Sequence, residues 1–141
     1  MTNANITQQE IDAILPKVAE TIADALGRDP EEAKPTSSIL GDLGGESIDL
    51  LDIVFRLERE FKVKLPRGKI VEDARGPLTE AEFESGGIVT PAGEQRLRDF
   101  LCEVPAERIK SPIKAAEIPK LFTVETFAKM VIREKRAAGG A

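Results

Sequence analysis

The chain has 141 residues, of which 41% are hydrophobic and 32% charged, a composition typical of one soluble globular domain. It contains no histidine, which excludes Ser-His-Asp and Cys-His catalysis and most zinc sites. The net charge of -5 and the lack of Tyr and Trp argue against nucleic-acid binding, because phosphates attract basic side chains and bases stack on aromatic ones.

The first predicted helix begins at Thr7 and ends at Gly27. Thr7 and Glu10 have the spacing of a capping box, and Gly27 is placed to act as a C-terminal glycine. Pro16 predicts a kink, or a helix that effectively begins near it, because proline removes a backbone donor. The apolar residues at helical spacing are Ile11, Leu15, Val18, Ala19, Ile22 and Leu26.

A long loop and a second helix follow. The stretch 28–45 is rich in Pro, Ser, Asp and Gly, and we expect Ile39, Leu40 and Leu43 to anchor it to the core. The next predicted helix spans residues 47–61. Its apolar stripe consists of Leu50, Leu51, Val54, Leu57 and Phe61.

The region 65–121 is predicted to form several short elements, because prolines and glycines interrupt it. Thr79 with Glu82 has capping-box spacing, and Thr90 before Pro91 is typical of an N-cap followed by a first-turn proline. The last predicted helix begins at Thr123 and ends near Arg136. Its apolar face consists of Val124, Phe127, Ala128, Val131 and Ile132. No strand pattern of convincing length occurs, so the predicted fold is all-α.

Ser47 follows a flexible turn and opens the second helix. Gly44 and Gly45 permit a tight turn, and the free N–H groups and dipole of the helix N-terminus favour an anionic phosphate ester on Ser47. A simpler interpretation is that Ser47 is only the N-cap of the helix.

The stretch Asp42-Leu43-Gly44-Gly45-Glu46-Ser47-Ile48-Asp49, continued to Leu57-Glu58-Arg59-Glu60-Phe61, resembles the acyl carrier protein signature. The first helix, the loop with Ser38-Ile39-Leu40 and the segment from Phe122 to Phe127 also resemble that family. The resemblance implies a four-helix bundle in one domain, residues 1–141, with residues 65–121 as an inserted helical subregion. It also implies 4'-phosphopantetheine on Ser47, transferred from coenzyme A by a magnesium-dependent phosphopantetheinyl transferase.

The implied function is to tether acyl groups as thioesters for fatty acid, lipid or polyketide-type biosynthesis. The chain would be a non-catalytic carrier, a monomer without a metal site, that serves ketosynthase, ketoreductase, dehydratase and acyltransferase enzymes. By the same resemblance, residues of the second helix contact partners or line the acyl-chain cleft. The expected partner contacts are Ile48, Asp49, Asp52, Phe55 and Glu58, and the expected cleft residues are Leu51, Val54, Leu57 and Phe61.

The sequence also departs from the family. Glu46 replaces the usual aspartate, and Arg56 and Arg59 dilute a helix that is normally acidic, which indicates a specialised carrier with fewer partners. The inserted region forms either a lid that shields or recognises an unusual acyl chain, or a packed decoration that adds core or docks one partner. Two functional alternatives stay open: an unmodified protein-interaction module, and a peptidyl or aryl carrier.

Location is predicted from what the sequence lacks. No apolar run approaches the length of a spanning helix, and the N-terminus does not resemble a signal peptide. The single cysteine, Cys102, cannot form an internal disulfide or a cysteine metal cluster. We therefore expect a cytoplasmic protein whose partners carry basic patches.

Overall fold

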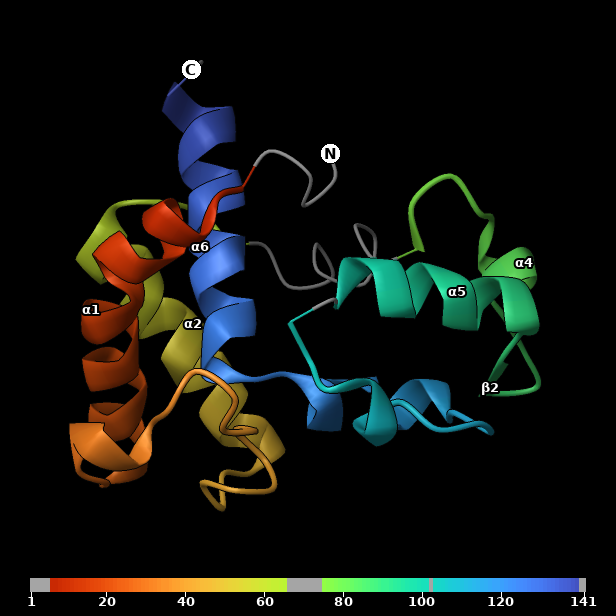
Figure 1. Ribbon diagram of the computed structural model, residues 1–141, viewed down its shortest axis with the longest axis horizontal. Coiled ribbons are helices and arrows are strands. Elements are labelled where there is room, and N and C mark those ends of the chain that lie inside the picture. Colours follow the sequence, from red (N-terminus) through yellow and green to blue (C-terminus); the bar gives the residue numbers. More distant parts are fainter. Residues whose placement is uncertain (1–5, 66–74, 102, 140–141) are drawn as a thin grey trace.

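The structure is a computed structural model that describes residues 6–65, 75–101 and 103–139, without the side chains of Ser47, Ala106 and residues 137–139. Cys102 and part of the inserted region, residues 66–74, lie outside the described residues. Helices α1, α2 and α6 gather on one side of the molecule, and α4, β2 and α5 on the other (Figure 1). The elements are α1 (Gln8–Leu26), η2 (Pro30–Glu32), α2 (Ser47–Phe61), α4 (Glu80–Phe83), β1 (Glu84–Ser85), β2 (Ile88–Val89), α5 (Pro91–Phe100), η3 (Ala106–Arg108), η4 (Ala115–Leu121) and α6 (Val124–Gly139). The predicted all-α fold is confirmed.

Helix α1 runs through Pro16 without ending there. The capping box of Thr7 and Glu10 forms as predicted, and Gly27 ends the helix in the left-handed conformation at φ 68°. The alternative that the helix begins near Pro16 is therefore wrong. Pro16 is exposed, so water can reach the carbonyl that loses its backbone donor, while Ile11 on the preceding turn is buried and anchors that turn.

Helices α4 and α5 of the inserted region begin at the two predicted caps. Thr79 accepts a hydrogen bond from the Glu82 amide, and Thr90 accepts one from the Gly93 amide. Between α4 and α5 the chain forms a small antiparallel hairpin that the sequence did not predict. Its strands are two residues each, too short for an alternating pattern, and Gly86 and Gly87 form the turn at φ 60° and 83°.

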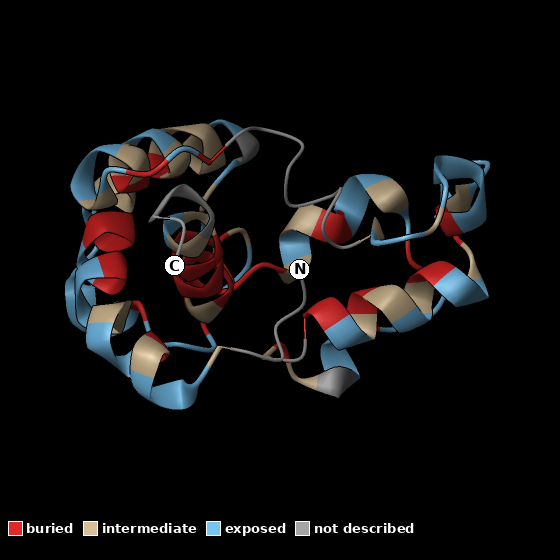
Figure 2. Cartoon of the chain, turned by 90° about the horizontal axis from the view of Figure 1, so that it is seen from above, coloured by how far each residue is buried: buried red, intermediate tan, exposed pale blue. Residues whose placement is uncertain are grey.

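Helix α6 is the central helix, and it is buried on both faces (Figure 2). The predicted apolar face packs towards the core, and each of its residues is buried. The opposite face is buried as well, because the inserted region covers it. The buried residues of that second face are Thr126, Lys129, Met130 and Arg133.

The inserted region contacts α6 through polar and aromatic groups. The Glu103 carboxylate lies 2.9 Å from the Lys129 ammonium, and it accepts a hydrogen bond of 2.6 Å from the Thr126 hydroxyl. The side chains of Glu103 and Lys129 are only 1% and 7% exposed, so this ion pair is shielded from water. The guanidinium of Arg133 lies 4.5 Å from the centre of the Phe100 ring, a cation–π distance.

One hydrophobic cluster joins the helix bundle and the inserted region. It contains Val18 and Ile22 of α1, Phe127 of α6, and Phe83 and Leu97 of the inserted region. Among the described helices, none is both long enough and apolar enough to cross a membrane.

Candidate attachment site

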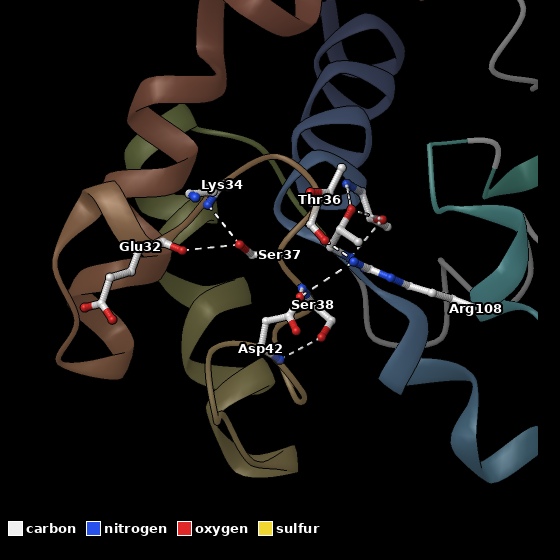
Figure 3. A network of polar contacts seen from close by, with 9 residues as sticks. Glu32, Lys34, Thr36, Ser37, Ser38, Asp42 and Arg108 are labelled. Atoms are coloured by element: carbon white, nitrogen blue, oxygen red, sulfur yellow. Dashed lines mark hydrogen bonds and ion pairs between the residues drawn. The ribbon is translucent and has the colours of Figure 1, made fainter.

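The attachment loop, residues 36–46, is closed by a reciprocal pair of hydrogen bonds. The Ser38 amide donates to the Asp42 carboxylate at 3.0 Å, and the Asp42 amide donates to the Ser38 hydroxyl at 2.8 Å (Figure 3). Ile39 and Leu43 are buried as predicted, and Leu40 is partly buried against the core. The conformation of the loop is therefore fixed both by hydrogen bonds within it and by apolar side chains that pack into the core.

The two glycines that precede α2 have different physical roles. Gly44 has φ 69°, a conformation that side chains disfavour. A Cβ on Gly45 would lie 2.9 Å from the Ile39 carbonyl oxygen and 3.3 Å from the side chain of Leu26. The Gly45 amide donates to that same carbonyl at 2.9 Å. The glycine pair thus provides a turn and then a close backbone approach, which together set the direction in which α2 begins.

The cap of α2 is built by Glu46 and Asp49. Glu46 is the N-cap residue, with φ −118° and ψ 169°, and its amide donates to the Asp49 carboxylate at 2.8 Å. Ser47 is the first residue of the helix, so the interpretation of Ser47 as the N-cap is wrong. The reason is that Asp49, three residues after Glu46, stands at the position from which a carboxylate reaches back to the cap amide.

Two large apolar side chains of α2 point into solvent. Ile48 is 72% exposed and Phe55 is 54% exposed. Both were predicted to contact partners, and the structure leaves both accessible. Burying such side chains in a complex is favourable, by about 1.5–3 kcal/mol for a full burial.

The three acids that were predicted to contact partners each have a partner within the chain. The Asp49 carboxylate caps α2, and the Asp52 carboxylate pairs with Arg56 at 3.1 Å. The Glu58 carboxylate accepts a hydrogen bond of 2.7 Å from the Leu65 amide just after the helix. Most of the negative charge on α2 therefore stabilises local structure in the free protein.

The residues predicted to line an acyl-chain cleft are not equivalent in the structure. Leu57 is fully buried in the core, whereas Leu51, Val54 and Phe61 are half-buried. The centre of the buried face also includes Ile53, which the predicted stripe omitted although it stands four residues before Leu57. The buried face of α2 is thus rotated slightly from the predicted one.

A contact between the inserted region and the attachment loop was not predicted. Arg108 donates to the Thr36 carbonyl at 2.7 Å and lies 3.8 Å from the Asp42 carboxylate (Figure 3). The two ends of this contact are far apart in the sequence, so local spacing carries no signal for it. The contact fixes the inserted region against the loop that precedes Ser47.

Comparisons with known proteins agree with this site. A family model described as a phosphopantetheine attachment site matches residues 16–75, a range that includes Ser47. An acyl carrier protein of Bdellovibrio bacteriovorus is 41% identical over 54 residues, which cover 38% of this chain and 69% of that protein. The acyl carrier protein AcpXL of Rhizobium meliloti is 45% identical over 74 residues, which cover 52% of this chain and 78% of that protein. This chain belongs to the acyl carrier protein family.

Acyl carrier proteins are generally non-catalytic, and their prosthetic group is a covalently attached 4'-phosphopantetheine. The site of this acyl carrier protein suits such a group. The N-terminus of a 15-residue helix has a dipole that favours the negative charge of a phosphodiester. A serine as the first helical residue provides the hydroxyl oxygen that the ester requires.

Proposed function

We propose that this protein carries its 4'-phosphopantetheine on Ser47 and uses it to hold acyl groups as thioesters. The observation that carries the proposal is the position of Ser47 as the first residue of α2, separated from the glycine turn only by the N-cap residue Glu46. Glu46 and Asp49 make the cap, so the helix end does not depend on the serine as its N-cap. When bound, the prosthetic group supplies a thiol that forms the thioester.

The residues of the chain have three tasks in this function. The attachment loop, closed between Ser38 and Asp42, presents the serine at a fixed position. The N-terminus of α2 stabilises the negative charge of the phosphodiester. The exposed side chains of Ile48 and Phe55 offer apolar contact area to the phosphopantetheinyl transferase and to the enzymes that build or transfer the acyl chain.

The partner surface differs from a uniformly acidic helix. Arg56 neutralises Asp52 and Arg59 is exposed, so the face of α2 carries mixed charge. A surface of mixed charge favours a narrower set of partners, because a partner must then place negative groups opposite the arginines and positive groups opposite the acids. The carboxylates of Asp49, Asp52 and Glu58 already have partners within the chain. We propose that they bind basic groups of another protein only where those groups displace these internal partners.

The cargo is an acyl group of fatty acid, lipid or polyketide-type biosynthesis. We propose that the half-buried Leu51, Val54 and Phe61, with Leu57 behind them, line a cleft that admits the chain. Ketosynthase, ketoreductase, dehydratase and acyltransferase enzymes are the expected partners. A cytoplasmic location and a monomeric state remain predictions from the sequence.

Intact mass tests the attachment. The protein is incubated with coenzyme A, magnesium and a broad-specificity phosphopantetheinyl transferase, and we expect one phosphopantetheine increment. Ser47→Ala should abolish the increment, while Ser85→Ala, at an exposed serine of β1, should retain it. A folded wild-type protein that gains no mass would support the unmodified interaction module instead. Loading by an aminoacyl group in place of an acyl group would support the peptidyl or aryl carrier.

A further inference from the structure

The attachment loop has two halves that are held in different ways. The first half, residues 36–39, is bonded to the backbone that leads into α6. The Ile39 amide donates to the Phe122 carbonyl at 3.1 Å, and the Val124 amide donates to the Ser37 carbonyl at 3.1 Å. The second half, residues 40–46, leads directly into Ser47. The position of the serine therefore depends on how the second half is joined to the first.

The bonds that join the two halves to each other lie within the loop. The Leu43 amide donates to the Ser38 carbonyl at 3.0 Å, and the Gly45 amide donates to the Ile39 carbonyl at 2.9 Å. The Asp42 carboxylate accepts from the Ser38 amide at 3.0 Å. The Asp42 side chain is 54% exposed, so water competes with the Ser38 amide for this carboxylate.

Arg108 contacts both halves of the loop from the inserted region (Figure 3). Its Nη1 atom donates to the Thr36 carbonyl at 2.7 Å, and its Nη2 atom lies 3.8 Å from Oδ2 of Asp42. That oxygen is the one that accepts from the Ser38 amide. Two nitrogens of one planar guanidinium thus connect the halves, and the positive charge favours the conformation in which Asp42 closes the loop.

Arg108 projects from a segment that is itself fixed. It ends η3, where its amide donates to the Pro105 carbonyl at 2.9 Å. The next residue, Ile109, is buried, and its carbonyl accepts a hydrogen bond of 2.6 Å from Arg98 of α5. A contact made from a fixed segment costs less conformational entropy than one made from a loose segment. The inserted region therefore provides a stable base for the contact with the loop.

The residues just before Ser47 depend on the closed loop for their position. Gly44 and Gly45 have no side chains, and the side chain of Glu46 is exposed. No side chain of these three residues therefore anchors the backbone to the core. Bonds such as that from the Gly45 amide to the Ile39 carbonyl hold the backbone instead, and these bonds belong to the closed loop.

We propose that Arg108 is a positioning residue for the attachment at Ser47. It stabilises the closed attachment loop, and it thereby raises the fraction of molecules whose serine is presented correctly to the phosphopantetheinyl transferase. The inserted region then contributes to the attachment site through this one side chain, in addition to packing against α6. This inference rests on the proposed attachment at Ser47.

Amide hydrogen exchange of the apo protein tests the closed loop directly. We expect Arg108→Gln to speed exchange at the Leu43 and Gly45 amides about three- to tenfold, because a hydrogen bond and a half-exposed ion pair are lost. Lys110→Gln is the matched control: it removes the same charge, and within the described part of the chain the Lys110 ammonium makes no ion pair or hydrogen bond. It should exchange at the wild-type rates. Equal exchange in Arg108→Gln and wild type would overturn the proposal.

The kinetics of modification test whether the closed loop matters for the serine. If fewer molecules have a closed loop, the apparent affinity of the transferase for the apo protein falls. We expect Arg108→Gln to raise KM about threefold with kcat unchanged, while Lys110→Gln behaves as wild type. An unchanged KM would overturn the proposal. A wild-type protein that gains no phosphopantetheine increment would overturn the attachment itself, whereas the exchange experiment would still report on the loop.

A second substitution separates an effect on the loop from a contact with the transferase. Asp42→Asn keeps an oxygen that can accept from the Ser38 amide, but it removes the charge that faces Arg108. In the Asp42→Asn background, Arg108→Gln should raise KM by a smaller factor than in the wild-type chain, because part of its contact is already lost. The same factor in both backgrounds would mean that Arg108 acts on the transferase and not through the loop, which would overturn the proposal.

Discussion

At the scale of single residues, Glu125 shows how partial burial and neighbouring charges change the chemistry of a carboxyl on α6. Partial burial raises the pKa of Glu125, the ammonium of Lys129 opposes this, and the carboxylates of Glu103 and Asp12 raise the pKa further. A carboxyl whose pKa is raised on folding stabilises the fold only while it is protonated. That contribution is complete below the unfolded pKa and is lost as the pH rises through the folded pKa.

Glu125→Gln should therefore be more stable than wild type at neutral pH. The difference in the free energy of unfolding should vanish below the pKa of the carboxyl in the unfolded chain and grow as the pH rises. Urea denaturation at a series of pH values measures it, with Glu134→Gln on the same helix as the control. A Glu125→Gln variant that is less stable than wild type at pH 7 would show that the charge is favourable at the N-terminus of α6.

A substitution of Ile48 should change the function of the protein while leaving its stability almost unchanged. Because it is largely exposed, Ile48→Ser should change the free energy of unfolding by no more than about 0.5 kcal/mol. Modification by the transferase should slow several-fold, since an apolar contact next to the attachment serine is lost. Ile88→Ser, at an exposed apolar residue of the hairpin, is the matched control and should be modified at the wild-type rate.

At the scale of elements, the acidic residues of α2 are expected to contribute different amounts to the free energy of unfolding. Asp49→Ala removes the acceptor for the cap amide of Glu46 and should cost about 1 kcal/mol of stability. Asp52→Ala breaks only a half-exposed ion pair with Arg56 and should cost about 0.3–0.5 kcal/mol. Chemical denaturation of the two variants gives the comparison. Equal losses would mean that the cap contributes no more to stability than the half-exposed ion pair does.

The shielded ion pair between Glu103 and Lys129 should be the most sensitive contact between the inserted region and α6. Glu103→Gln removes the negative charge that lies 2.9 Å from the buried Lys129 ammonium, which should cost about 3–5 kcal/mol. The exposed pair of Lys17 and Glu20 provides the control, since Glu20→Gln should cost less than about 1 kcal/mol. Similar losses in the two variants, measured by thermal or chemical unfolding, would contradict a shielded pair.

The sequence predicted the elements whose signals are local. The caps at Thr7, Thr79 and Thr90 depend on residues three positions apart, and all three form as predicted. The alternative interpretation of Ser47 as the N-cap of α2 named the wrong residue, because serine is a good N-cap and its neighbour Glu46 is not a usual one. The hairpin was missed because strands of two residues have no period to detect.

At the scale of the whole molecule, the position of the inserted region could not be predicted from the sequence. The sequence predicted that this region forms either a lid or a packed decoration, but not that it covers the second face of α6. Lys129 and Arg133 would ordinarily be assigned to a solvated face, and their burial depends on Glu103 and Phe100 more than 25 residues away. Contacts at that separation leave no pattern along the chain.

We expect the bundle and the inserted region to unfold together as one domain. They share one hydrophobic cluster, and α6 belongs to both. Denaturation followed by far-ultraviolet circular dichroism should show a single transition, and native-state hydrogen exchange should give α5 and α6 similar opening free energies. Loss of protection in α5 at a denaturant concentration that leaves α6 protected would show that the inserted region is a separate unit.

The buried second face of α6 also limits how this carrier can be engineered. The last helix of a small bundle normally has one apolar face. Such a helix can be transferred between related proteins if that single face fits the core of the recipient. Here the opposite face carries Lys129 and Arg133, which are matched to Glu103 and Phe100. Excising the inserted region would uncover that face, and grafting the region onto a plain carrier would bury a carboxylate without a cation. The inserted region and α6 must therefore be transferred as a pair in any chimaeric carrier.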